Sequence, residues 1–277
     1  MTRRRRKIAR TVALHLLSIL FVSFLLLPIY QMLITAFETT WSSPSHLYPH
    51  PITFRNFVTM WEIVPRLPRY LLNSFIYGIG VSLLSLAIAI PSSYGLSRFR
   101  IKAGPTLMFL LFYTNMFAPI MFIVPLYEMM GALHLLNTYL AVIISGTLFT
   151  VPFCTLLLSS YIESVPKDIE DAALVDGASR LQVLFRVVLP LLAPAIVSIV
   201  IYAFITGWSQ QFILALTLIQ DDNLMPITQG LYQFFSRSSV SWSELMAAAL
   251  VSTIIPVVMF LSVQKYIVKG LTAGSIK

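Results

Sequence analysis

Residues 164–190 read SVPKDIEDAALVDGASRLQVLFRVVLP, and the rest of the chain is organised around this stretch. Together with Glu163, it holds five of the eleven acidic residues, and long charge-free apolar runs lie on both sides of it. A short polar segment between two runs of membrane length is typical of a loop held at a membrane face. We therefore expect residues 163–190 to form either a docking surface there or an ordinary amphipathic loop.

The first half of this loop has the pattern of a short helix that ends at a glycine. Pro166 suits the first turn of a helix, where its missing N–H costs little. Ile169, Ala172 and Ala173 follow helical spacing, so the two alanines share a face that another backbone could approach closely. Gly177 stands where the helix would end, and it predicts a left-handed C-cap.

The second half predicts another helix. Ser179 and Gln182 form S-x-x-Q, the signature of a capping box at a helix start. The predicted helix places four apolar side chains on one face (Leu181, Leu184, Phe185 and Val188) before Pro190 ends it. The loop is thus expected to be a helix, a glycine turn and a second helix.

The composition excludes a soluble globular domain. Of 277 residues, 57% are hydrophobic and 11% charged, whereas globular domains carry about 25% charged residues. Six charge-free stretches reach the length of about 20 residues that a membrane-spanning helix needs; they are approximately residues 11–37, 70–97, 103–127, 137–162, 191–220 and 245–264. We predict an all-α membrane protein with six transmembrane helices, because a barrel would show short alternating strands instead.

The basic residues predict the orientation of these spans. If residues 1–10 form a basic cytoplasmic arm, fifteen of the nineteen Lys and Arg residues lie on the inner side and four lie outside. Such an excess marks the cytoplasmic side. Both termini and the 163–190 loop are therefore expected in the cytoplasm, and the loop at 38–69 outside. The basic residues follow the membrane edges and form no groove-sized patch, which argues against nucleic-acid binding.

The residues of the 163–190 loop resemble a known family. Three groups carry the resemblance: Glu170-Asp171-Ala172-Ala173, Asp176-Gly177-Ala178 and Leu189-Pro190. Their sequence and spacing are similar to the EAA motif of permease subunits in binding-protein-dependent ABC importers. The form resembles the carbohydrate-importing, maltose-type branch, although Asp171 stands where that family usually has glutamate. Gly270, Leu271 and Gly274 of the 265–277 tail also resemble that branch.

The resemblance implies a fold, a function and partners. It implies the type I ABC importer permease fold over residues 11–277, in a bacterial inner membrane. It implies import of a mono- or oligosaccharide that a solute-binding protein delivers, driven by an ATPase dimer and with a second permease subunit. The nine motif residues would couple this chain to the ATPase, and the tail would reach the same partner.

The sequence contains no catalytic or metal-ligating constellation. Its four histidines lack metal-ligand spacing, and no carboxylates pair across a helix. A P-loop motif is also missing, so we expect ATP and Mg²⁺ to bind a separate ATPase subunit and this chain to be a transport subunit and not an enzyme. Cys154 is the single cysteine, which excludes an intrachain disulfide.

Polar side chains within the predicted spans are candidates for a solute path. Tyr113 and Asn115 lie in the third span, and Trp208, Gln210 and Gln211 lie in the fifth. Substrate sites of transporters lie near the membrane midplane on polar or irregular helix stretches. Asn115 would alternatively form a hydrogen bond between helices, and the fifth-span residues would alternatively pack on a partner or close a gate.

Other functions remain open at this level. An importer for an amino acid, a polyamine or glycerol phosphate would share the loop. A secondary transporter would need an ionisable residue for ion coupling within the membrane, and His15 alone lies in a predicted span. An accessory membrane protein would not need the glycine-capped acidic loop.

Overall fold

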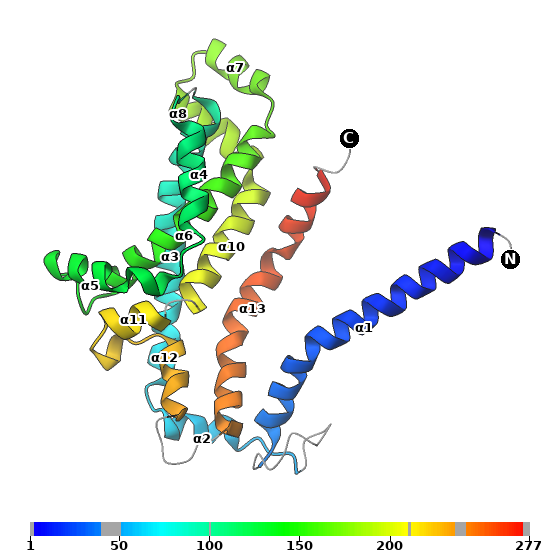
Figure 1. Cartoon of the computed structure of the whole chain (residues 1–277), viewed down its shortest axis with the longest axis vertical. Helices are drawn as coiled ribbons and strands as arrows, with labels where there is room; N and C mark the ends of the chain where they lie inside the picture. Colours follow the sequence, from blue (N-terminus) through cyan, green and yellow to red (C-terminus); the bar gives the residue numbers. More distant parts are fainter. Residues whose placement is uncertain (1–2, 40–50, 100, 210–211, 236–241, 274–277) are drawn as a thin grey trace. The chain divides into compact units, whose positions relative to one another are not determined.

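The computed structural model describes residues 3–39, 51–99, 101–209, 212–235 and 242–273, and for 3–10 and 265–273 the backbone alone. Throughout these residues the regular elements are helices, apart from an isolated bridge between Glu38 and Ile52 (Figure 1). The all-α prediction is thus confirmed. The chain divides into two units, Met1–Pro65 with Gln233–Ser252 and Arg66–Tyr232 with Thr253–Lys277.

The first unit is a long helix whose end is held by the segment that follows. It contains α1 (Arg3–Phe37), α2 (Asn56–Ile63), η4 (Gln233–Phe235) and the start of α13 (Trp242–Ala273). The buried side-chain amide of Asn56 donates to the carbonyls of Ala36 and Glu38, at 2.8 and 2.7 Å. The ring of Phe37 contacts Phe54 and Phe57. These contacts fix where the chain turns after α1.

The second unit is built on three helices that lie side by side, α3 (Leu67–Arg98), α6 (Tyr139–Glu163) and α10 (Ala193–Ser209), with α4 (Gly104–Thr114) on α6 (Figure 1). Glycines permit the close approach. A Cβ added to Gly207 would lie 2.9 Å from the Cα of Gly78, and one added to Gly80 would lie 2.5 Å from the Ile143 side chain. Small residues are typical of helix contacts in membranes.

One end of this unit is closed by hydrogen bonds to a loop. This end holds α11 (Phe212–Leu218), η3 (Asp222–Leu224) and α12 (Ile227–Tyr232). The side-chain amide of Asn73 donates to the carbonyls of Asn223 and Met225, both at 2.8 Å, and its oxygen accepts from the Tyr139 hydroxyl. The structure thus joins the start of α3 and the start of α6 to the segment after α11.

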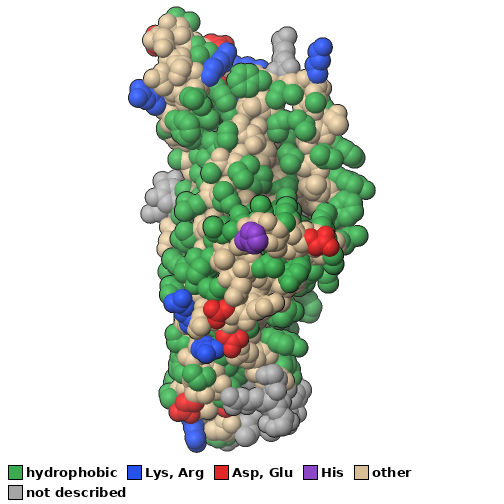
Figure 2. All heavy atoms as spheres, turned by 90° about the vertical axis from the view of Figure 1, so that its left-hand side faces the viewer, with side chains coloured by type: hydrophobic (Ala, Val, Ile, Leu, Met, Phe, Trp, Pro, Cys, Tyr) green, Lys and Arg blue, Asp and Glu red, His purple; other side chains and the backbone are tan. Residues whose placement is uncertain are grey.

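The described residues allow between four and six membrane spans, in agreement with the six predicted, and two of these spans are bent. By length and composition, four described helices could cross a membrane: α1 from Thr11, α3, α6 and α13 up to Gln264. Two further pairs would each count as one span only if a sharp bend is allowed, which gives up to six. In Figure 2, hydrophobic side chains cover most of the visible face, while Lys and Arg lie at its upper end and in its lower third.

Residues 103–127 do not form one straight helix. After α4 the chain turns by 101° into η1 (Pro119–Phe122) and α5 (Ile123–Ala132). Ala118 is extended, with ψ of 134°, because a residue before proline avoids the helical region. The eleven residues of α4 rise only about 16 Å, about half of the hydrocarbon thickness.

Within the predicted fifth span, residues 191–220, the structure describes α10 over 17 residues and α11 over seven, and residues 210–211 between them lie outside the described part. At its start, α10 makes an angle of 85° with the Arg180–Leu191 segment. That segment belongs to the 163–190 loop, which is therefore set off sharply from the bundle.

Candidate functional site

The 163–190 loop forms a distinct structure at the end of the second unit. Its elements are α7 (Lys167–Val175), α8 (Arg180–Val183), the π-helical turn η2 (Leu184–Val188) and α9 (Leu189–Leu191), and α7 lies at the top of Figure 1. Gly177 has φ of 87°, the left-handed conformation expected of a C-cap glycine. The Ser179 hydroxyl accepts from the Gln182 N–H, and the Gln182 side chain accepts from the Ser179 N–H. The predicted order of helix, glycine turn and helix is confirmed.

The predicted apolar face of the second helix is wrong in part. Val183, Leu184 and Val188 are buried, whereas Leu181 and Phe185 are exposed. The π-helical turn at Leu184–Val188, with its i→i+5 hydrogen bonds, shifts the residues within and after it around the helix axis and so changes the face that Phe185 occupies. An exposed apolar pair therefore lies beside α7.

The predicted coupling residues separate into two groups. Asp171, Ala172, Asp176, Gly177 and Pro190 are exposed. Ala173, Ala178 and Leu189 are half-buried and pack against the core formed by α3, α6 and the loop. Beside the first group, Val175 has 88% of its surface exposed, and the apolar side chains of Leu181 and Phe185 in the same loop are exposed as well.

The expectation that Glu170 faces a partner protein is wrong. Its carboxylate is buried and accepts from Arg98 Nε at 2.6 Å and from the Tyr94 hydroxyl at 3.0 Å. A buried carboxylate requires such partners, because burying an unpaired charge is costly. Asp171 is thus the exposed acidic residue at the motif position. Nothing in the local sequence pattern shows that Arg98 or Tyr94 would meet Glu170, because both lie more than 70 residues away along the chain.

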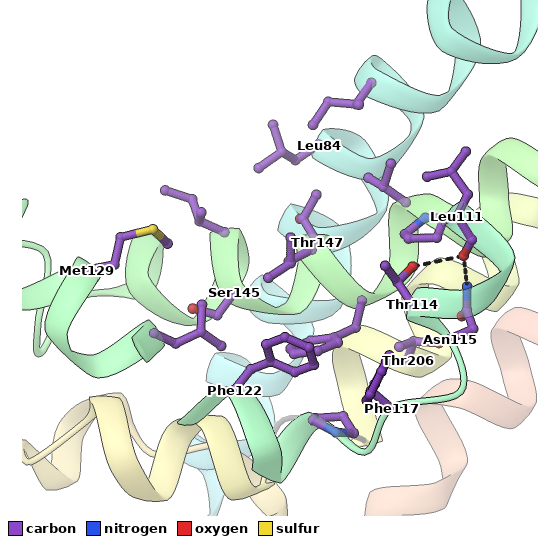
Figure 3. A pocket seen from close by; sticks show the side chains of 18 of the residues that line it. Leu84, Leu111, Thr114, Asn115, Phe117, Phe122, Met129, Ser145, Thr147 and Thr206 are labelled. Atoms are coloured by element: carbon purple, nitrogen blue, oxygen red, sulfur yellow. Dashed lines mark hydrogen bonds between the residues drawn. The ribbon is translucent and has the colours of Figure 1, made fainter. Parts of the chain in front are cut away.

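A cavity of about 610 Å³ lies inside the second unit, among α3, α4, η1, α6 and α10 (Figure 3). Its wall is mainly apolar and aromatic, with contributions from Leu84, Phe117, Phe122 and Met129. The volume is in the range of small-molecule sites, which are about 300–1,000 Å³. The angle between α4 and η1 opens this space, so the break in the predicted third span creates it.

Of the predicted path residues, Asn115 lines this cavity. Its side-chain nitrogen donates to the carbonyl of Leu111 at 3.0 Å, within its own segment and not to another helix (Figure 3). Tyr113 is exposed in a row of rings with Phe109 and Phe117. Trp208 is 4% exposed and stacks on Phe204, so it serves packing in this structure. Gln210 and Gln211 lie outside the described residues.

Ser145 also lines the cavity, although the sequence pattern did not predict it. It lies on α6, it is fully buried, and its hydroxyl has no hydrogen-bond partner in the structure. Figure 3 places it on the same wall as Thr147. Its only sequence signal was a hydroxyl within an apolar span, and serines in membrane helices more often serve close packing.

The predicted tail residues lie only partly within the described structure. Gly270 and Leu271 lie in the last turns of α13, and Gly274 falls outside the described residues. Among the described residues, His, Cys, Asp and Glu side chains form no group that could hold a metal ion. Cys154 is buried and forms no disulfide.

Comparison with known proteins places this geometry in a family. Residues 71–273 match the family described as the binding-protein-dependent transport system inner membrane component. The chain is 35% identical to the sulfoquinovosyl glycerol transport system permease protein SmoH of Agrobacterium fabrum over 84% of this chain and 81% of SmoH. It is 32% identical to the trehalose/maltose transport system permease protein MalG of Thermococcus litoralis over 99% of both chains.

A solved structure shares the fold. One chain of a bacterial ABC transporter involved in the import of the acidic polysaccharide alginate superposes with a TM-score of 0.76 and 23% identity, over 96% of this chain and 98% of that chain. The helical arrangement described above is therefore that of an ABC importer permease. The chain belongs to the family of binding-protein-dependent transport system inner membrane components, and it is a multi-pass membrane permease subunit and not an enzyme.

Proposed function

We propose that this chain translocates a mono- or oligosaccharide as one permease subunit of an ATP-driven importer. The observation that carries the proposal is the exposed surface of α7 and the glycine turn, which presents Asp171, Ala172 and Val175 away from the bundle. An apolar side chain that is 88% exposed beside a carboxylate is suited to a protein partner. The substrate class is supported by relatives named for sulfoquinovosyl glycerol and trehalose/maltose transport.

The partner at this surface is proposed to be the ATPase dimer. Asp171 would pair with a basic group of the ATPase, and Ala172 and Gly177 would allow its backbone to come close. ATP and Mg²⁺ would bind that subunit, because this chain has no P-loop sequence. Closure of the ATPase dimer would move α7, and the bundle would alternate between inward and outward access. The tail residues Gly270, Leu271 and Gly274 are proposed as a second contact with the same partner.

We propose the orientation that the excess of Lys and Arg residues on one side predicts. The loop would face the cytoplasm, as would both termini, and the opposite end of the second unit would face the solute-binding protein. Arg66 and Asp222 form an exposed ion pair of 2.7 Å at that end. The domain limits given above, with a permease domain at 11–277, remain part of this proposal, as does pairing with a second permease.

The cavity is proposed as part of the solute path. The Asn115 side chain and the Ser145 hydroxyl are among its polar groups, together with Thr114, Thr147, Tyr202 and Thr206, and its aromatic side chains suit the apolar face of a sugar ring. Tyr113, Trp208, Gln210 and Gln211 remain candidates for the path beyond the cavity, although Trp208 would have to leave its packed position.

Purification and uptake test the proposed function. The tagged chain is extracted in mild detergent, and every co-eluting protein is identified. We expect a P-loop ATPase and a second six-span permease, and we expect cells that lack the chain to lose import of a labelled oligosaccharide. Asp171→Arg should remove the ATPase from the eluate, whereas the control Glu163→Gln, an exposed change at the end of α6, should retain it. A chain that elutes alone, or unchanged sugar import with lost import of an amino acid, would contradict the proposal.

A further inference from the structure

Arg98 joins three helices at the end of the second unit where α7 lies. It is the last residue of α3, and its Nε donates to Glu170 Oε1 on α7 at 2.6 Å. One Nη donates to the carbonyls of Ile162 and Val165, at 2.7 and 2.8 Å, at the end of α6 and just beyond it. A single planar guanidinium group thus holds the ends of α3 and α6 and the middle of α7.

Glu170 is held by α3 at two points. While Oε1 accepts from Arg98, Oε2 accepts from the hydroxyl of Tyr94, one helical turn earlier on α3. Arg180 of α8 lies within electrostatic reach of the same hydroxyl. Because both carboxylate oxygens are bound to one helix, α7 cannot tilt relative to α3 without breaking at least one of these hydrogen bonds.

This pair differs from the other charges of the loop in its burial. The side chains of Arg98 and Glu170 are 5% and 3% exposed, whereas Asp168, Asp171 and Asp176 are exposed. A buried ion pair does not separate gradually, since each charge that loses its partner is left in an apolar setting. The planar guanidinium group of Arg98 forms hydrogen bonds through both Nε and one Nη. It therefore fixes the orientation of Glu170 relative to the end of α6 more strictly than the single ammonium group of a lysine would.

We propose that the Arg98–Glu170 pair, with Tyr94, is the rigid joint that passes the movement of α7 to α3 and α6. Glu170 is then a positioning residue for coupling, while Asp171 beside it contacts the partner. The inference rests on the proposed function, because a joint of this kind matters only if α7 moves with an ATPase. If the pair only stabilised the fold, one buried charge would not need to connect the 163–190 loop to both α3 and α6.

The test separates assembly from coupling. The chain is purified with its co-eluting ATPase and second permease and is reconstituted in liposomes with the binding protein. Solute import and ATP hydrolysis are measured per assembled complex. Glu170→Gln keeps the shape of the side chain but removes its charge. We expect it to retain the ATPase while import per ATP hydrolysed falls by about 5- to 150-fold, the range of typical coupling between sites.

Tyr94→Phe provides a second test of the joint, and Glu163→Gln provides the control. Tyr94→Phe removes one of the two bonds to Glu170, and we expect a smaller fall in the same ratio. It also serves if Glu170→Gln does not accumulate in the membrane. Glu163→Gln neutralises an exposed carboxylate at the end of α6, and we expect it to match the unmodified chain.

The outcomes distinguish this inference from the proposed function. Import per ATP that stays unchanged in Glu170→Gln, or in Tyr94→Phe if only that variant accumulates, would overturn the joint and leave the proposed function intact. A fall in the amount of complex at an unchanged ratio would also overturn it, since that is the result of a purely structural role. An unmodified complex without ATP-dependent import would overturn the proposed function and the joint together.

Discussion

Gly177 and Glu170, both in the 163–190 loop, are each required for a different physical reason. Gly177 adopts φ of 87°, and a Cβ added to it would meet no atom within 4 Å. The requirement for glycine is therefore conformational and not steric. Glu170, in contrast, is required by its partners, because it fills the only position of α7 at which an acidic side chain is buried within the described structure.

Replacement of Gly177 tests the conformational requirement. A non-glycine residue in the left-handed region costs about 1–2 kcal/mol, and asparagine tolerates it better than other residues. We expect Gly177→Val to lower the thermal unfolding temperature of the purified chain and to reduce import. Gly177→Asn should stay close to the unmodified chain in both measurements. Equal effects of the two variants would show that the left-handed conformation is not the reason for the glycine.

Removal of one partner from each ion pair tests the importance of burial. Glu170→Ala leaves Arg98 buried without its carboxylate, and breaking a buried pair in this way costs about 3–5 kcal/mol. Arg66→Ala breaks the pair with Asp222, whose side chains are about half exposed, and we expect at most about 1 kcal/mol. Thermal unfolding of both purified variants under identical detergent conditions provides the measurement. Similar destabilisation by the two changes would contradict the described burial of Glu170.

At the scale of elements, the close crossing of α3 and α10 determines the core of the second unit. The Cβ of an alanine at 207 would lie 2.9 Å from Gly78 Cα, 2.9 Å from Val81 Cβ and 3.0 Å from the Tyr77 carbonyl oxygen. Two of these atoms are backbone, so the helices themselves would have to separate. Gly95 lies on α3, as Gly78 does, and a Cβ added to Gly95 would meet no atom within 4 Å.

Gly207→Ala is therefore expected to destabilise the chain by about 1–3 kcal/mol through overpacking. Gly95→Ala is the matched control, and it should be neutral or stabilise by about 0.5–1 kcal/mol, because alanine loses less backbone freedom in a helix than glycine. Thermal unfolding of the two variants compares them directly. Tolerance of alanine at 207 to the same degree as at 95 would mean that α3 and α10 are further apart than described.

At the scale of the molecule, the second unit has two chemically different ends. One holds α7 and the Arg98–Glu170 pair, and the other holds the hydrogen-bonded closure around Asn73, Tyr139 and Asn223. The hydrophobic runs of the helices separate them. A permease needs such a difference, because an ATPase and a binding protein must act on opposite sides of the membrane.

Cysteine labelling tests which end faces the cytoplasm. In a Cys154→Ala background, single cysteines replace Asp168, in the first turn of α7, or Asp221, just before η3. We expect a membrane-impermeant maleimide to label the Asp221→Cys variant in spheroplasts and the Asp168→Cys variant only after the membrane is opened. Both replaced side chains are exposed to solvent or partly so in the structure. The reverse pattern would invert the proposed orientation of the second unit.

The sequence predicted those features that depend on neighbouring residues. The Gly177 cap, the box of Ser179 and Gln182, and the long helices α1, α3, α6 and α13 were all foreseen and are confirmed. Backbone conformation at glycine, capping and the length of an apolar run act within one or two helical turns. Such features need no knowledge of the remainder of the chain.

Only the tertiary structure decided the rest. Glu170 meets Arg98 across 72 residues, and Tyr77 bonds to the Leu224 carbonyl across 147, so no local pattern could reveal either partner. Pro119 marks the break after α4 in the sequence, but only the structure shows that the chain bends there by 101° and that residues on both sides of the bend line one cavity with Ser145. The physical reason is common to these cases: burial and charge pairing depend on which distant segments pack together, whereas helix formation and membrane length are properties of the segment itself.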